Sequence, residues 1–298
     1  MGPTASGKSA IGLAVARYVR AQQKDVEIVS VDSMQVYRGM DIGTAKPDAS
    51  EQQEFEHHMI DICDPNENYT VARFQRECRS VLTAIADRGN CALLIGGTGL
   101  YLRSLTDDLQ IPGRFPEVKK DLEENFATDE LFVRLQQLDP VAAARMEPTN
   151  RRRIVRALEV TIGSGQPFSS FGPGLETHSD APFAIVGLEI DRTTLDERIS
   201  ARYEAQLAAG LVGECERLLT HGVSRTAAQA LGYREIFDHL QKGIPLDEAM
   251  ELAVTRTRKF ARRQQRWFRR DPRIEWIPTT GEVDENCVAL LGQRLIDY

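Results

Sequence analysis

The apolar residues of the first hundred positions fall into two kinds of pattern, one with the period of a helix and one of short runs. Three short, mostly apolar runs, at residues 26–31, 59–62 and 91–95, predict strands. Thr70 stands at the N-cap of a predicted helix that ends at Gly89. An earlier helix is predicted from five apolar residues on one face: Ile11, Ala14, Val15, Tyr18 and Val19. Strands that alternate with helices indicate an α/β domain built on a parallel sheet.

The strand pattern stops at about Pro112. Residues 116–162 carry apolar positions at helical spacing, so we expect an all-helical subdomain inserted over residues 113–181. A strand predicted at residues 183–190 suggests that the chain then rejoins the first sheet. The predicted catalytic core comprises residues 1–112 and 182–298.

The first loop of the chain has the phosphate-binding pattern G-x-x-x-x-G-K-[ST], in which glycines let backbone N–H groups wrap a phosphate chain. Its residues are Gly2, Pro3, Thr4, Ala5, Ser6, Gly7, Lys8 and Ser9. Lys8 would supply a positive charge, the Ser9 hydroxyl would hold Mg²⁺, and the following helix would point its positive end at the anion. Such a loop normally follows a buried strand, whereas only Met1 precedes it here, so we expect a less ordered start than usual. The pattern predicts phosphate binding and leaves the reaction open.

Candidate catalytic residues follow two of the predicted strands. Asp32 follows the first strand, where open α/β sheets bind their ligands, and it would either accept a proton or cap a turn. The strand at 91–95 is followed by Gly96, Gly97, Thr98 and Gly99, at a place where a typical ATPase carries a magnesium-binding acid. The glycines would let a ligand approach the backbone and the Thr98 hydroxyl would reach it. An ordinary glycine turn is the alternative.

The composition is that of a soluble globular protein, with 298 residues of which 42% are hydrophobic and 27% charged. The formal net charge of −7 does not by itself suggest a nucleic-acid partner. The five cysteines are scattered without a C-x-x-C pair, which favours free thiols in a reducing cytosol. The sequence has no signal peptide and no apolar run of membrane-spanning length, so we expect a cytoplasmic protein without a membrane partner.

Basic residues are concentrated in three places. A long helix predicted at residues 246–268 and the positions after it are rich in arginine, with Trp267 and Phe268 interleaved, which favours RNA as a partner. A basic helix packed on acidic neighbours is the alternative. The arginines at 151–153 and 156 suit either a phosphate backbone or a solvated face. Arg198 and Arg202 lie four residues apart on one helical face, where they would close over a phosphate or lie in solvent.

Together these pieces resemble the tRNA dimethylallyltransferases, also called tRNA isopentenyltransferases, over nearly the whole chain. The segments that carry the resemblance are residues 2–9, 32–47, 96–101, 153–159 and 231–235. The resemblance implies a P-loop NTPase-like parallel sheet flanked by helices, with the inserted all-helical subdomain. It also implies transfer of a dimethylallyl group from dimethylallyl diphosphate to N6 of adenosine 37 in the tRNA anticodon loop, with release of diphosphate. The eukaryotic Cys/His finger is absent, which fits a bacterial-type enzyme.

The resemblance also implies roles for individual residues. The phosphate loop would hold the diphosphate of the donor together with Arg198 and Arg202, Mg²⁺ would sit on Ser9, and ATP would not be consumed. Asp32 would be the general base near N6, and Thr98 would contact the reacting donor. Contacts with the anticodon stem-loop are expected from Asp32, Ser33, Met34, Gln35, Thr98, Lys119, Arg152, Arg153, Ile154, Val155 and Arg156. Lys119 stands where the family often has arginine, and it keeps the charge for a phosphate contact without the planar fork.

Two other functions fit part of the pattern. One is a P-loop small-molecule kinase that uses ATP with Asp32 as its base, and the other is a P-loop RNA-binding protein without catalysis. The strand end at residues 96–98 and the basic final helix favour prenyl transfer over the kinase. We expect the enzyme to be a monomer.

Overall fold

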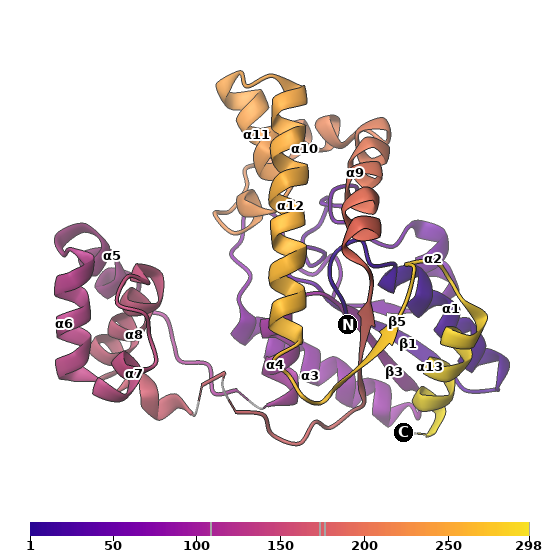
Figure 1. Cartoon of the computed structure of the whole chain (residues 1–298), viewed down its shortest axis with the longest axis horizontal. Helices are drawn as coiled ribbons and strands as arrows, with labels where there is room; N and C mark the ends of the chain where they lie inside the picture. The colour runs from indigo at the N-terminus through magenta and orange to yellow at the C-terminus, as the bar shows by residue number, and fades with distance from the viewer. Residues whose placement is uncertain (108, 173, 176, 298) are drawn as a thin grey trace. The chain divides into compact units, whose positions relative to one another are not determined.

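Six consecutive buried residues form the central strand of the structure, a computed structural model that describes every residue except Asp108, Pro173, Glu176 and Tyr298. This strand, β1 (Val26–Val31), lies between β2 (His57–His58) and β3 (Cys91–Gly96), and both neighbours run parallel to it. Helices cover a parallel sheet on both faces, which explains why β1 is a nearly continuous apolar run. The α/β architecture with a parallel sheet flanked by helices is confirmed (Figure 1).

Two strand predictions are wrong. The run at residues 59–62 is not a strand, because Met59 and Asp61 adopt left-handed backbone angles with φ of 63° and 53°; the pairing residues are those of β2 just before it. The later strand, β4 (Ile185–Glu189), does not rejoin the first sheet. It pairs in parallel with β5 (Ile274–Pro278) to form a two-stranded sheet of its own.

The start of the chain contacts β4. The Met1 amino group donates a hydrogen bond to the Val186 carbonyl oxygen at 2.5 Å, and the Leu188 amide donates to the Met1 carbonyl oxygen at 2.8 Å. Burial, followed by the charge of Lys8, lowers the pKa of the Met1 amino group to about 5. The residue just before the phosphate loop is thereby attached to the second sheet.

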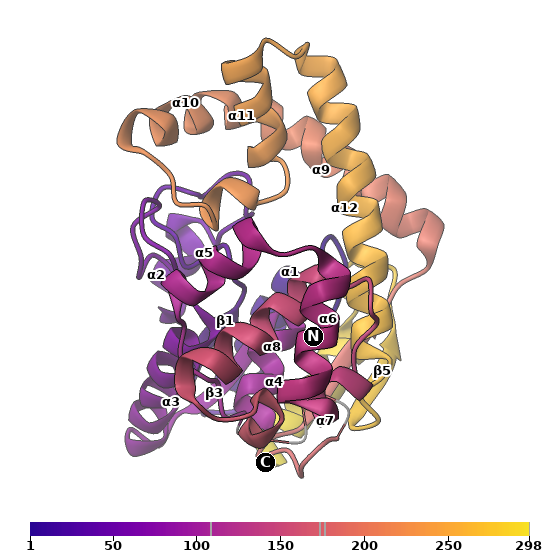
Figure 2. The same cartoon turned by 90° about the vertical axis from the view of Figure 1, so that its left-hand side faces the viewer.

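The structure divides into two compact units, of which the larger comprises Met1–Thr106 and Ala181–Tyr298. Its helices are α1 (Lys8–Ala21), α2 (Ala49–Glu54), α3 (Val71–Asp87), α4 (Gly99–Thr106), α9 (Arg192–Ala208), α10 (Leu211–His221), α11 (Tyr233–Lys242), α12 (Leu246–Phe268) and α13 (Glu285–Asp297), with a 3₁₀ turn at Ala227–Gln229. The Thr70 hydroxyl accepts a hydrogen bond from the Arg73 amide at 3.2 Å, which confirms the predicted cap of α3. In Figures 1 and 2, α9 and α11 pack against α12, the longest helix of this α/β unit, and α10 packs against α9 and α11.

The smaller unit, Asp107–Asp180, is helical. It contains α5 (Pro116–Asn125), α6 (Thr128–Leu138), α7 (Pro140–Ala144), α8 (Arg151–Ser164) and a 3₁₀ turn at Phe168–Phe171. It has its own apolar core, to which α5, α6 and α8 contribute Leu122, Leu135 and Leu158. Across the described part of both units, no helix combines the length and apolarity needed to cross a membrane.

Candidate active site

A cavity of about 850 Å³ in the α/β unit is lined by several of the predicted site residues. Lys8 of the phosphate loop, Asp32 after β1 and Thr98 after β3 all line it. Arg198 and Arg202 of α9 line it too. A transfer reaction at this place requires the first three side chains to face one space, and they do.

The phosphate loop presents only part of its length to the cavity. Its lining residues are Thr4, Ala5, Gly7, Lys8 and Ser9, whereas Gly2, Pro3 and Ser6 are buried behind them. The Lys8 ammonium donates to the Pro3 carbonyl oxygen at 3.1 Å. Burial lowers the pKa of Lys8 to about 8, against the nearby Asp32 carboxylate, which raises it, while Arg202 lowers it further. A bound anion would therefore compensate a concentration of poorly solvated positive charge.

The two arginines of α9 contact the loop rather than lying in solvent. Arg198 Nε donates to the Ala5 carbonyl oxygen at 3.0 Å. Arg202 Nη1 donates to Thr4 Oγ1 at 2.8 Å, and Nη2 donates to the Gly43 carbonyl oxygen at 3.1 Å. Arg202 Nε is buried and has no hydrogen-bond partner among the described residues. An unsatisfied guanidinium N–H beside a phosphate loop suits an anionic ligand.

Asp32 caps a turn, which is one of the two roles that its position in the sequence left open. Its Oδ1 accepts hydrogen bonds from the amides of Met34 at 2.8 Å and Gln35 at 3.4 Å, so the carboxylate caps the turn after β1. No hydrogen bond from a described residue reaches its other oxygen, Oδ2, and the side chain lines the cavity. Thr98 lies close by, because its Oγ1 accepts from the Ser33 amide at 3.1 Å.

The glycines after β3 make room for α12 rather than for a ligand. A Cβ atom on Gly97 would lie 2.6 Å from Gln264 Nε2, and one on Gly99 would lie 2.1 Å from Trp267 Nε1. Gln264 Nε2 donates to the Gly97 carbonyl oxygen at 2.7 Å, and its Oε1 accepts from the Thr4 amide at 2.9 Å. Gln264 could not be predicted as a site residue from the sequence, because a glutamine among many arginines carries no motif of its own.

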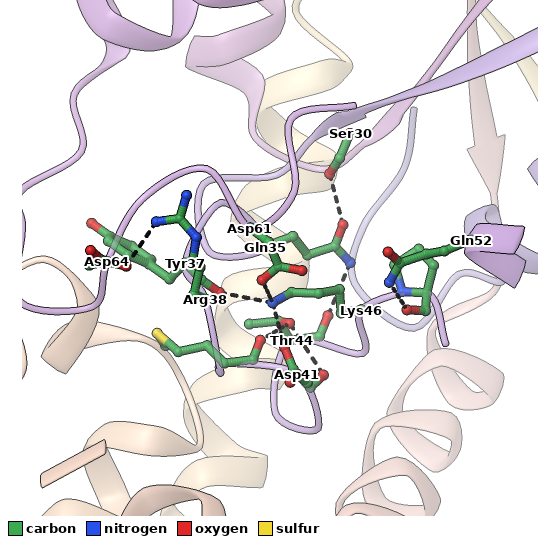
Figure 3. Close-up of polar contacts among 12 residues, drawn as sticks. Ser30, Gln35, Tyr37, Arg38, Asp41, Thr44, Lys46, Gln52, Asp61 and Asp64 are labelled. Carbon is green, nitrogen blue, oxygen red and sulfur yellow. Dashed lines mark hydrogen bonds and ion pairs between the residues drawn. The ribbon is translucent and has the colours of Figure 1, made fainter. Parts of the chain in front are cut away.

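Side-chain hydrogen bonds and ion pairs hold together the loop that follows Asp32 (Figure 3). The Gln35 amide accepts from Ser30 Oγ at 2.7 Å and donates to the carbonyl oxygens of Thr44 and Ala45 at 3.3 and 3.2 Å. Gln35 is thus held by its own chain. The buried Lys46 ammonium donates to the carboxylates of Asp41 and Asp61, at 2.5 and 2.6 Å, and to the Tyr37 carbonyl oxygen at 2.8 Å. Residues 35–46 therefore form a rigid wall beside the cavity.

Residues 35–271, which include Thr98, α12 and part of the cavity lining but neither the phosphate loop nor Asp32, match the family model described as IPP transferase. The chain belongs to the IPP transferase family. The tRNA dimethylallyltransferase of Kineococcus radiotolerans is 46% identical over 290 residues, covering 95% of this chain and 91% of that protein. The corresponding protein of Geobacter metallireducens is 43% identical, covering 98% of this chain and 95% of its own length. This IPP transferase is accordingly an enzyme of the tRNA dimethylallyltransferase type.

Solved structures of related enzymes share the fold of this IPP transferase. A tRNA isopentenylpyrophosphate transferase from Bacillus halodurans superposes with a TM-score of 0.70 at 32% identity, covering 99% of this chain and 95% of that one. A eukaryotic dimethylallyltransferase acting on tRNA superposes with a TM-score of 0.75 at 25% identity, covering 93% of this chain and 72% of the other. The predicted P-loop NTPase-like fold is confirmed.

The basic residues of α12 fall into two groups, one paired within the protein, as in the alternative of a basic helix packed on its neighbours, and one exposed. Some are held by this IPP transferase's own polar groups: Arg256 by Glu235, Arg258 by Ser200 and Arg269, just past the helix, by Glu189. Lys259, Arg263 and Arg266 are exposed, and no described carboxylate lies within ion-pair distance of them. They are four and three residues apart, so they share one face of the helix. We call these three residues the α12 basic stripe.

The arginine cluster of the helical unit is divided in the same way. Arg152 and Arg153 are exposed at the start of α8. Arg156 Nη2 donates to the Pro112 carbonyl oxygen at 2.8 Å. Ile154 and Val155 are buried in the core of this unit, so their side chains are unavailable to tRNA, contrary to the expectation for residues 152–156. Elsewhere in the unit, Lys119 on α5 lies 3.7 Å from the Glu123 carboxylate.

Proposed function

We propose that this enzyme transfers the dimethylallyl group of dimethylallyl diphosphate to N6 of adenosine 37 in tRNA and releases diphosphate. The observation that carries the proposal is the meeting of Lys8, Asp32 and Thr98 in one cavity. The relatives are named tRNA dimethylallyltransferases, which supports the choice of donor and acceptor.

The phosphate-loop side of the cavity suits the donor diphosphate. Ionisation of an allylic diphosphate builds negative charge on the leaving group, and preorganised positive groups stabilise that charge. Lys8, Arg198 and Arg202 supply them here. Mg²⁺ would be held by the Ser9 hydroxyl, which faces the same cavity as the Asp32 carboxylate, and such oxygen ligands are those that Mg²⁺ prefers. The ion would add charge neutralisation of the diphosphate.

The strand-end side of the cavity suits the acceptor. Asp32 Oδ1 is occupied by the turn that it caps, so Oδ2 is the oxygen that would take the proton from the attacking N6. Thr98 and Ser33 would orient the reacting atoms from the adjoining strand end. An adenine must leave its stack to enter a cavity, which is easiest in a single-stranded anticodon loop.

The tRNA backbone would be bound by exposed cations. In the α/β unit these are the three residues of the α12 basic stripe. In the helical unit they are Arg152 and Arg153, and the half-buried Lys119 would join them. We propose that residues 32–35 contribute near the reacting base, and that the enzyme acts in the cytoplasm as a monomer.

One assay separates the proposed function from the other two candidates. The enzyme is incubated with unmodified tRNA and Mg²⁺, with either dimethylallyl diphosphate or ATP. The tRNA is then digested to oligonucleotides whose sequence and mass are measured by mass spectrometry, and hydrolysis of ATP is assayed separately. Prenylated adenosine at position 37 is the expected product. ATP turnover without prenylation would favour the kinase, and tight tRNA binding with neither reaction would favour a binding protein.

A further inference from the structure

The Gln264 side chain joins the two sides of the cavity. Its amide is buried, with 8% of the residue exposed, and it makes one hydrogen bond to each side. Oε1 accepts from the Thr4 amide of the phosphate loop at 2.9 Å, and Nε2 donates to the Gly97 carbonyl oxygen at 2.7 Å. A single primary amide therefore spans the gap between the phosphate loop and the turn after β3.

Both partners of Gln264 lead directly to groups of the proposed reaction. On the phosphate side, Thr4 also accepts a hydrogen bond from Arg202 through Oγ1, at 2.8 Å. On the other side, Gly97 precedes Thr98, whose Oγ1 accepts from the Ser33 amide next to Asp32. A shift of the Gln264 amide would change the separation of these two sets of groups while leaving each set assembled.

The surroundings of Gln264 prevent such a shift. A Cβ atom on Gly97 would lie 2.6 Å from Gln264 Nε2, so that glycine admits the amide at close range. Nearby on the same helix, Trp267 fills the space above Gly99 in the same manner. A terminal amide that is hydrogen-bonded at both ends and packed this closely can adopt only one position.

We propose that Gln264 is a positioning residue that fixes the distance between the donor diphosphate and the acceptor base. Gln264 lines the cavity, and its amide bonds the protein on both sides rather than a reacting atom. It acts by holding the phosphate loop and the Gly97–Thr98 turn at one separation, and this role rests on the proposed function. Because a misplacement of about 1 Å can cost about 10²-fold in rate, losing this link should affect the transfer step far more than the binding of either substrate.

The first test compares Gln264→Met, which keeps the length of the side chain and removes both hydrogen bonds, with the unaltered enzyme. Single-turnover transfer is measured at saturating donor and tRNA, and the dissociation constant of each substrate is measured separately. The expected result is a loss of about 10²-fold in the transfer rate, with each dissociation constant changed by less than about threefold. Gln265→Met is the matched control on the same helix, because Gln265 makes a 3.5 Å contact with the Ile190 carbonyl oxygen and touches neither side of the gap.

Gly97→Ala tests the same link from its other end. If Gln264→Met does not fold, Gly97→Ala alone should lower the transfer rate by about 10²-fold with little change in either dissociation constant. The added Cβ would displace the Gln264 amide, so the two substitutions should not be additive in the transfer rate when combined. Three results would overturn the inference: an unchanged rate in Gln264→Met, a donor dissociation constant that rises as much as the rate falls, or an equal loss in Gln265→Met. If the unaltered enzyme transfers no dimethylallyl group, the proposed function itself fails and the inference falls with it.

Discussion

The charged ammonium group of Lys8 is buried, so water solvates it poorly. Burial lowers the pKa of its ammonium to about 8, and the Asp32 carboxylate only partly offsets this. A diphosphate binds the charged form, because the neutral amine offers no positive charge to the leaving group. The donor affinity of the free enzyme should therefore depend on pH in the range where Lys8 titrates.

We predict that kcat/KM for the donor falls as pH rises above about 8, approaching a tenfold loss per pH unit. The sign follows from the lowered pKa, since Lys8 is charged below it and neutral above it. Initial rates are measured from about pH 6.5 to about 9.5, a range that brackets the pKa of Lys8. The donor concentration is varied, the tRNA is saturating and the ionic strength is constant. The rates should show the inflection. In Lys8→Arg the charge persists throughout, so this inflection should disappear. If it persists there, another group is responsible.

The two carboxylate oxygens of Asp32 have different roles in the proposed mechanism. Oδ1 caps the turn through the Met34 and Gln35 amides, and Oδ2 is left for the substrate. Asp32→Asn keeps the acceptor for the turn and removes the base, so single-turnover transfer should fall about 10²- to 10⁴-fold. The dissociation constants for donor and tRNA, measured on the same preparation, should change little. A transfer rate within a few-fold of the unaltered enzyme would remove Asp32 from the proposed mechanism.

At the scale of elements, the loop of residues 32–47 is held at more than one point. Lys46 holds its far end, as Figure 3 shows. The buried Glu214 carboxylate of α10 holds the middle, because it accepts the consecutive amides of Asp41, Ile42 and Gly43 at 3.0, 2.9 and 3.3 Å. The Tyr233 hydroxyl of α11 donates to the same carboxylate at 2.6 Å. Helices from the last third of the chain thus fix the loop that carries Asp32.

Glu214→Gln should therefore weaken both the fold and the reaction. The new NH₂ group would face backbone N–H groups that need an acceptor, and a buried donor left unpaired costs about 1–3 kcal/mol. We expect the free energy of unfolding in urea to fall by about that amount, and transfer to fall with it because the loop loosens. Glu216→Gln is the control, since Glu216 is exposed on the same helix. Equal stability of the two variants would show that the Glu214 contacts do not hold the loop.

The elements that the sequence predicted well are those with long or strongly patterned signals. The bounds of α12 and β1 were predicted correctly because each repeats its pattern over its whole length. The strand at residues 59–62 was predicted wrongly, because this short run is mostly apolar but has left-handed backbone angles at Met59 and Asp61. The phosphate loop, Asp32 and Thr98 were found from local motifs. Gln264 and Glu214 were not, since their partners lie up to 260 residues away and only the folded chain brings them together.

At the scale of the whole molecule, exposed positive charge is gathered at particular sites although the formal net charge is −7. Folding neutralises several arginines, such as Arg256 against Glu235 and Arg269 against Glu189. What remains exposed includes the α12 basic stripe in one unit and Arg152 and Arg153 in the other. A polyanion responds to such local fields and not to the sum of charges.

Each of these two groups should contribute to the affinity for tRNA through release of counterions. The logarithm of the association constant falls linearly with the logarithm of salt concentration, and removing one phosphate-contacting cation reduces the slope by about 1. Lys259→Ala/Arg266→Ala and Arg152→Ala/Arg153→Ala should therefore each weaken binding and each reduce the slope by about 2. The control is Arg17→Ala/Arg76→Ala, which removes two exposed charges from α1 and α3. Titrations of labelled tRNA at several salt concentrations measure all three pairs. A slope that drops as much in the control, or in neither test pair, would mean that tRNA binds elsewhere on the molecule.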